Sequence, residues 1–131
     1  MALSAAEAER AEFSGRRGDY IARSWTRTSG GTSYDADSEL VQIRRGPRSS
    51  ATLVASSDPA DTSDDVALIT TTGTDLTADP VVIAWQCEAD EYLKLAAGDH
   101  YWIGIDVTVD GKPREIQRHT WTVLEQTAVR P

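Results

Sequence analysis

The feature that most constrains the fold is an alternating stretch in the C-terminal third of the chain, His100–Leu124. Apolar residues alternate with polar or small ones over Tyr101–Val109, which is the period of a strand with one buried face. Asp110-Gly111 follows at once, and this dipeptide readily adopts the positive φ angles of a two-residue type I′ turn. The chain then returns through a second run that contains Trp121 and Val123. This pattern predicts a β-hairpin.

A two-residue turn also fixes the register of the hairpin, because Val109 must then face Lys112. In an unbroken ladder with this register, Trp121 and Val123 lie on the polar face. A shift of one residue is needed to bury them. We therefore predict a β-bulge within Gln117–Thr120.

Other short apolar stretches predict the remaining strands, because turn residues separate them at a spacing of roughly ten residues. In the first stretch, Ile21 and Trp25 share a face. About seven strands in all predict an all-β fold, a β-sandwich in one domain. The stretches that precede the hairpin are Asp19–Thr28, Glu39–Arg45, Ala51–Ser56, Val66–Thr71 and Val81–Gln86.

Two short helices are predicted beside the strands. Ser4 and Glu7 form a capping box for a short N-terminal helix that extends to Phe13. Acidic residues at the start of Glu88–Ala97 suit the N-terminal end of a second helix at 88–97, and Gly98 offers a left-handed stop. The expected organisation is a helical arm over residues 1–17, a sandwich over 18–124 and a tail over 125–131.

Composition and charge exclude several classes of function. The net charge of −8 disfavours nonspecific binding to nucleic acid or to anionic membranes. The longest apolar runs, such as Val81–Trp85, fall far short of the ~20 residues that span a bilayer. Cys87 is the only cysteine, which rules out an intramolecular disulfide and fits assembly in a reducing cytoplasm. We expect no nucleic-acid partner and no membrane partner.

The charge is unevenly distributed along the chain. Basic residues gather in Arg10–Arg48, and acidic residues gather in Asp58–Asp99. This asymmetry has two interpretations. The charged residues form an ordinary solvated surface, or a basic face of one subunit contacts an acidic face of its neighbour, as in a ring. Trp102 is the tryptophan expected on an outer face, where it would serve a subunit interface in preference to a carbohydrate-stacking surface. The candidate interface residues are Arg23, Arg27, Arg44, Arg45, Arg48 and Trp102.

Residues that commonly carry chemistry form no recognisable motif. His100 and His119 approach one another across the hairpin but lack an evident third metal ligand. The aspartates of residues 57–65 offer oxygen ligands to Ca²⁺, but their spacing is not that of an EF-hand. We expect Cys87 to be a small buried hydrophobic side chain. We predict no metal, no cofactor and no enzymatic activity. The aspartates in question are Asp58, Asp61, Asp64 and Asp65.

The landmarks of the chain also follow a characteristic order. A Gly-Asp pair opens a strand that bears an aromatic residue, and an Arg-containing turn closes the next strand. A hydrophobic strand, an acidic helical turn that ends in Leu-x-Ala-Gly, a Tyr-x-x-x-Val hairpin and an aromatic-x-Val strand come after these. The corresponding segments are Gly18–Trp25, Val41–Gly46, Val81–Gln86, Glu88–Gly98, Tyr101–Val109 and Thr120–Val123.

This order resembles the immunoglobulin-like N-terminal domain of siphophage baseplate upper proteins and related small phage tail proteins. The resemblance implies an immunoglobulin-like sandwich that acts as a structural virion protein in the tail, baseplate or head–tail region of a tailed bacteriophage. It implies assembly in the host cytoplasm, with copies of the chain and other phage structural proteins as partners. The Asp-rich loop over 57–65 and the four tryptophans depart from the family pattern. A capsid decoration protein and a carbohydrate-binding module are the alternatives.

Overall fold

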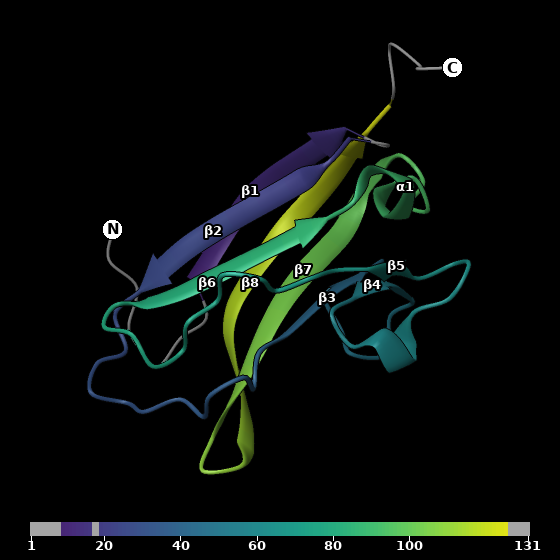
Figure 1. Ribbon diagram of the computed structural model, residues 1–131. Coiled ribbons are helices and arrows are strands. Elements are labelled where there is room, and N and C mark those ends of the chain that lie inside the picture. Colours follow the sequence, from purple (N-terminus) through teal and green to yellow (C-terminus); the bar gives the residue numbers. More distant parts are fainter. Residues whose placement is uncertain (1–8, 17–18, 126–131) are drawn as a thin grey trace.

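A computed structural model describes residues 9–16 and 19–125, and it is built almost entirely of strands (Figure 1). A 3₁₀ turn, η1 (Pro59–Asp61), and one short helix, α1 (Ala89–Tyr92), interrupt them. The strands are β1 (Glu9–Arg16), β2 (Ile21–Arg27), β3 (Leu40–Arg44), β4 (Leu53–Ser56), β5 (Ala67–Leu68), β6 (Val81–Cys87), β7 (Gly98–Val109) and β8 (Lys112–Leu124).

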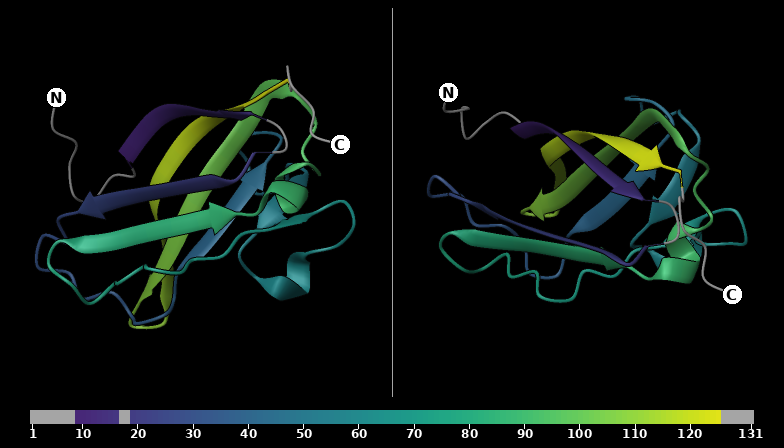
Figure 2. Two further views of the ribbon diagram at one scale, coloured as in Figure 1. Left: turned by 45° about the horizontal axis from the view of Figure 1, so that its top comes forward. Right: turned by 90° about the horizontal axis from the view of Figure 1, so that it is seen from above.

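The strands form two sheets of unequal size. The larger has the order β1-β8-β7-β3-β4-β5, and the smaller is the antiparallel pair of β2 and β6. In the larger sheet β1 runs parallel to β8 and β4 runs parallel to β5, whereas the other neighbours are antiparallel. Figure 2 shows β2 and β6 over one face of the larger sheet, which leaves the opposite face uncovered. The predicted all-β sandwich is confirmed at this level.

The core lies between the two sheets, where the alternating residues place their apolar side chains. Val41 and Ile103 contribute from the larger sheet, and Ile83 and Trp85 contribute from the smaller one. Each of these side chains is buried, as the period of two predicts for strands with one covered face. Cys87 is also buried, and burial together with nearby carboxylates raises the pKa of its thiol to about 12.

The hairpin of β7 and β8 turns as predicted. Asp110 and Gly111 have φ angles of 51° and 76°, and Val109 pairs with Lys112. The carboxylate of Asp35 accepts hydrogen bonds from Thr108 Oγ1 (2.7 Å) and from the backbone N–H of Gly111 (2.8 Å). The turn is therefore held from outside the hairpin by a side chain that precedes β3.

The predicted register shift is present, at a slightly different place. Asp106 pairs with Glu115, whereas Ile105 pairs with Gln117, so Ile116 is an extra residue in β8. The bulge thus lies one residue before the stretch in which it was predicted. Its effect is the expected one, because the residues that follow on β8 change faces.

Two consequences follow from this bulge. Trp121 becomes fully buried. The carbonyl oxygen of Ile116 accepts a hydrogen bond of 2.8 Å from Nη1 of Arg27, which reaches it from the smaller sheet. A charged side chain is tolerated at this depth because it satisfies a buried backbone group.

The predicted N-terminal helix is wrong over residues 9–13. These residues belong to β1, which pairs along its whole length with β8, from Glu9 opposite Gln117 to Arg16 opposite Leu124. A short alanine-rich helix has little stability of its own, and pairing with a sheet edge overrides its local propensity. The described part of the predicted arm is therefore a strand of the sandwich. Residues 1–8, 17–18 and 126–131 lie outside the described residues.

The second helix is much shorter than the predicted range 88–97. Only Ala89–Tyr92 are helical, and Gly98 begins β7 opposite Val123 without a left-handed φ angle. Tyr92 is fully buried, and its hydroxyl accepts a hydrogen bond of 2.7 Å from Nε1 of Trp121. This anchor ends the helix after one turn, because the chain must then enter the larger sheet.

Candidate binding groove on the outer sheet

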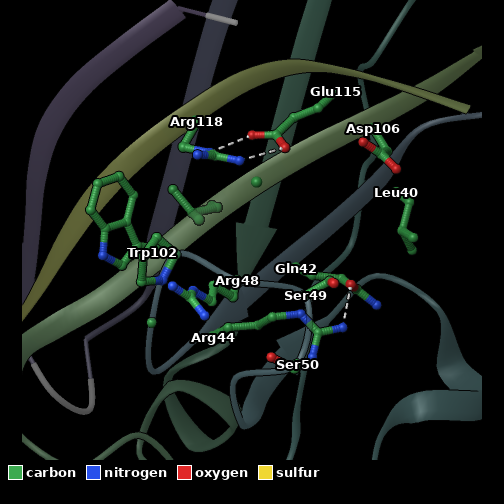
Figure 3. A pocket seen from close by; sticks show the side chains of 14 residues that line it. Leu40, Gln42, Arg44, Arg48, Ser49, Ser50, Trp102, Asp106, Glu115 and Arg118 are labelled. Atoms are coloured by element: carbon green, nitrogen blue, oxygen red, sulfur yellow. Dashed lines mark hydrogen bonds and ion pairs between the residues drawn. The ribbon is translucent and has the colours of Figure 1, made fainter.

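The uncovered face of the larger sheet carries a groove of about 590 Å³ (Figure 3). It lies over the strands β3, β7 and β8 and is bounded by the turn that follows β3. Its main lining residues are Gln42, Arg44, Arg48, Trp102, Gly104, Asp106, Glu115 and Arg118.

The floor of the groove is formed by β7. Because Ile103 and Ile105 point into the core, the alternate residues Trp102, Gly104 and Asp106 face outward. A Cβ atom placed on Gly104 would meet no heavy atom within 4 Å. The missing side chain therefore leaves open space in the middle of the floor, between Trp102 and Asp106.

One end of the groove is basic and aromatic. Arg44 donates from Nη1 to the carbonyl oxygen of Ala51 (2.9 Å) and from Nη2 to Oε1 of Gln42 (3.0 Å). Arg48 is exposed, and its side chain makes no hydrogen bond or ion pair with any described residue. Figure 3 shows Arg48 next to the half-buried Trp102. An aromatic surface and an unengaged cation thus adjoin at this end.

The other end of the groove carries two carboxylates that face each other across strands. Asp106 pairs with Glu115, and Arg118 holds Glu115 through Nε–Oε1 (2.7 Å) and Nη2–Oε2 (3.1 Å) bonds. The side-chain carboxylate of Asp106 accepts no hydrogen bond from any described residue. Burial, reinforced by the negative charge of Glu115, raises the pKa of Asp106. Asp106 is therefore the carboxylate of this pair that remains available to a ligand.

Of the six predicted interface residues, three meet in this groove: Arg44, Arg48 and Trp102. Arg45 lies outside it, exposed, with its guanidinium carbon 5.3 Å from the centre of a tyrosine ring.

Arg23 and Arg27 are not on the outer sheet at all. They share the inward face of β2, because they alternate with Ala22, Ser24 and Thr26. The guanidinium carbon of Arg23 lies 5.5 Å from the ring centre of Trp121. Arg27 is only 5% exposed, so it is not positioned to contact a neighbouring subunit through the surface.

The acidic loop that follows β4 lies beside the groove. Asp61 Oδ2 accepts hydrogen bonds of 3.4 Å from Gln42 Nε2 and 3.3 Å from Ser56 Oγ. Gln42 in turn accepts the bond from Arg44. Arg44 and Asp61 therefore lie on the same side of the molecule, each hydrogen-bonded to Gln42.

The remaining candidate ligands are dispersed. His119 is buried and stacks on Trp25 with ring centres 4.8 Å apart, whereas His100 is exposed. Asp58 caps η1 by accepting a hydrogen bond from the backbone N–H of Ala60 (3.0 Å). Within residues 9–16 and 19–125, no group of three or more His, Cys, Asp or Glu side chains is arranged to hold a metal ion. No helix in the same part of the chain is long and apolar enough to cross a membrane.

Neither family models nor curated proteins match this sequence.

The sequence did not lead us to expect that Gly104, Asp106, Glu115 and Arg118 form one site. A usable signal was present, because the hairpin register that pairs Val109 with Lys112 also places Asp106 opposite Glu115. Outward positions on β7 follow from the same alternation that indicated Trp102. The hairpin pattern therefore predicts the outward positions on β7 and the pairing of Asp106 with Glu115.

Proposed function

We propose that the chain is a non-catalytic structural subunit of a tailed-bacteriophage virion, with an immunoglobulin-like sandwich that assembles with copies of itself and with other phage structural proteins. The observation that carries the assembly role is the position of the exposed large apolar side chains, all of which lie at one end of the described sandwich. The sequence resemblance supplies the class of particle.

The strand order supports the immunoglobulin-like assignment. In a variable-type immunoglobulin domain, strands G, F and C form one sheet that extends to C′, and strands B and E belong to the opposite sheet. Here β8, β7, β3 and β4 are neighbours in that order, and β2 pairs with β6. The first strand, β1, lies parallel beside β8 and forms one edge of the larger sheet.

The apolar end is formed by Tyr20, Leu93 and Leu124, which are 52%, 41% and 39% exposed. Tyr20 precedes β2, whose first residue pairs with the last residue of β6, and its hydroxyl bonds to Gln86 Oε1 (3.1 Å). Leu93 follows α1 directly after β6, and Leu124 ends β8. Figure 1 shows the ends of β6 and β8 beside α1. Exposed apolar side chains that gather in this way mark sites of protein contact.

Charged groups surround this end. Glu88 is the N-cap residue of α1 and Asp90 lies within it, both exposed, and Arg45 is exposed where β3 ends. An apolar centre with a charged rim is the usual anatomy of a protein interface. The predicted contribution of Arg45 to assembly is compatible with this placement.

The carboxylate pair in the groove supports a binding role over a catalytic one. Glycoside hydrolysis usually employs two carboxyl groups that both reach the substrate. Arg118 engages both oxygens of Glu115, which leaves only Asp106 unengaged. The arrangement therefore offers a hydrogen-bonding surface, not a pair of reacting groups.

Size-exclusion chromatography with light scattering tests the assembly role. We expect the purified chain to exceed its monomer mass, and we expect the combined change Tyr20→Ser, Leu93→Ser and Leu124→Ser to yield a monomer. Ala22→Ser and Thr26→Ser, on the exposed outer side of β2, provide the matched control and should leave the mass unchanged. A wild-type chain that is monomeric at every concentration contradicts self-assembly through this end.

Quantitative mass spectrometry of purified particles from the phage that encodes the chain tests the virion assignment. A small fixed copy number relative to the tail proteins indicates the tail, baseplate or head–tail region. A copy number that follows the capsid protein indicates capsid decoration instead. Absence of the chain from purified particles contradicts the assignment.

A further inference from the structure

The outer groove has no part in the assembly contact described above, and we propose that it binds a carbohydrate chain. In this site Trp102 stacks on a sugar ring, while Asp106 and the arginines bond to the hydroxyl groups on either side. The proposal is independent of the position of the subunit in a virion.

The shape of the groove suits a small or linear ligand. A volume of about 590 Å³ falls within the range of roughly 300–1,000 Å³ typical of ligand clefts. Because Gly104 lacks a side chain, the floor is open next to Trp102 on the outward side of β7. A ring that stacks on the indole is thereby admitted to the centre of the sheet.

The chemistry of the lining favours a hydroxylated ligand. A sugar hydroxyl both donates and accepts hydrogen bonds, so it needs acceptors and donors within one site. Asp106 provides an acceptor that has no partner among the described residues, and Arg48 provides unengaged donors. The apolar face of a sugar ring matches the apolar face of Trp102, which carries no charge of its own.

Several of these polar groups are held in place before any ligand binds. Arg44 is fixed by Ala51 and Gln42 and uses only two of its five N–H donors in the bonds described above. Arg118 is fixed by two bonds to Glu115. Side chains that are already ordered lose less conformational entropy on binding, which strengthens binding for a given number of contacts.

A protein partner fits this lining less well. Protein interfaces are enriched in aromatic residues and arginine, but their centres are depleted of Asp and Glu. This groove places two carboxylates, Asp106 and Glu115, in the same lining as its half-buried tryptophan. Charged groups line its floor as well as its rim, because Asp106 projects from the same strand as Trp102.

Isothermal titration calorimetry tests the proposal, with maltohexaose, cellohexaose, chitohexaose and hexagalacturonate as probes. The first three represent neutral glycans and the last represents anionic ones, so the panel also shows whether Arg48 selects a charged sugar. We expect at least one probe to bind at millimolar or lower concentration, and Trp102→Ala to weaken its binding by about tenfold.

Gly104→Leu provides the second variant, because it fills the floor without removing any hydrogen-bonding group. The backbone of Gly104 is not in the left-handed region, and the space around it is open, so the fold should tolerate the change. Ser24→Leu adds the same side chain at an exposed position of β2 and is the matched control. We expect Gly104→Leu to abolish binding and Ser24→Leu to leave it unchanged, with circular dichroism confirming that both variants fold.

Two results would overturn the proposal. The first is that none of the four hexasaccharides binds the wild-type chain. The second is that Gly104→Leu or Trp102→Ala converts an assembled wild-type chain to a monomer, because the groove would then be a protein interface. The triple change at Tyr20, Leu93 and Leu124 leaves the groove untouched, so failure of the assembly proposal is read from a different variant.

Discussion

The inner layer and the outer groove both contain tryptophan, but they surround it differently. Trp85 lies between the sheets, with its ring centre 6.3 Å from that of Trp25 and 5.5 Å from that of Trp121. Trp102 lies on the outer face of the larger sheet, in a groove that it shares with Arg48 and Asp106. An indole packed against other rings stabilises the fold, whereas an indole beside unengaged charged groups offers a surface to a ligand. The neighbours of a tryptophan thus indicate its role better than its residue type does.

The largest expected effect separates the two regions by stability. Trp85→Ala removes a side chain that is 1% exposed and should lower the free energy of unfolding by about 3–5 kcal/mol. Trp102→Ala should lower it by less than about 1 kcal/mol, because the site is half solvated and the truncation leaves no buried cavity. Urea unfolding followed by circular dichroism measures both. Equal losses would erase the distinction between core and groove.

The next effect concerns the inner layer and pH. Burial lowers the pKa of His119 to about 4, below its ordinary value of 6.5. The folded state therefore favours the neutral ring, so this contribution to stability is fully present above about pH 6.5 and is lost as the pH falls toward 4. As the pH falls from 6.5 to 4 and below, protonation of His119 should lower the free energy of unfolding by about 3 kcal/mol.

The control for this prediction is the second histidine, which is exposed. His119→Phe should flatten the dependence of the unfolding free energy on pH between 6.5 and 4, whereas His100→Gln should leave it in place. An unchanged slope in His119→Phe would show that another group titrates.

The smallest expected effect is a gain in stability. Gln117 is fully buried, and among the described residues neither its Oε1 nor its Nε2 has a hydrogen-bond partner. Gln117→Leu keeps the size of the side chain and should raise the unfolding free energy by about 1–2 kcal/mol, because an unsatisfied buried polar group is costly. The matched change on the outer face, Gln42→Leu, breaks the bonds to Arg44 and Asp61 and should bring no gain. A loss of stability in Gln117→Leu would reveal that the amide has a structural role.

Much of the fold could be predicted because it rests on alternation. The period of two located β2, β3, β6, β7 and β8, and the φ angles of Asp110 and Gly111 confirm the turn that joins the last two. The hairpin register requires a bulge before Trp121 but does not determine which residue of β8 is the extra one. That residue is Ile116, which is itself buried. At this position the Ile116 carbonyl meets Arg27 from the other sheet, and such a contact leaves no local pattern in the sequence.

The errors arose where local signals competed with distant contacts. The capping box at Ser4 is a real helix signal, but Glu9–Arg16 gain a whole ladder of backbone bonds from β8, a strand distant in the sequence. Arg27 was taken as a surface residue because of its charge. The alternation that places Ile21 and Trp25 inside also places Arg27 inside, so charge was given more weight than period.

The groove itself was predictable in part. Trp102 was expected on the outer face and lies there. Asp106 opposite Glu115 follows from the hairpin register, but the depth of the floor depends on the absence of a side chain at Gly104. The engagement of Glu115 by Arg118 across the bulge depends on a register shift whose exact place the sequence does not give.

Nuclear magnetic resonance of the four indole N–H groups, recorded during titration with the four hexasaccharides, distinguishes the inner layer from the outer groove. The resonance of Trp102 is assigned by its loss in Trp102→Phe. We predict that the chemical shift of this resonance changes with at least one hexasaccharide. The chemical shifts of Trp85 and Trp121, which lie in the core, should not change. If the Trp102 resonance stays fixed with all four sugars, or if the buried indoles shift as much as it does, the division between a structural inner layer and a binding outer groove is contradicted.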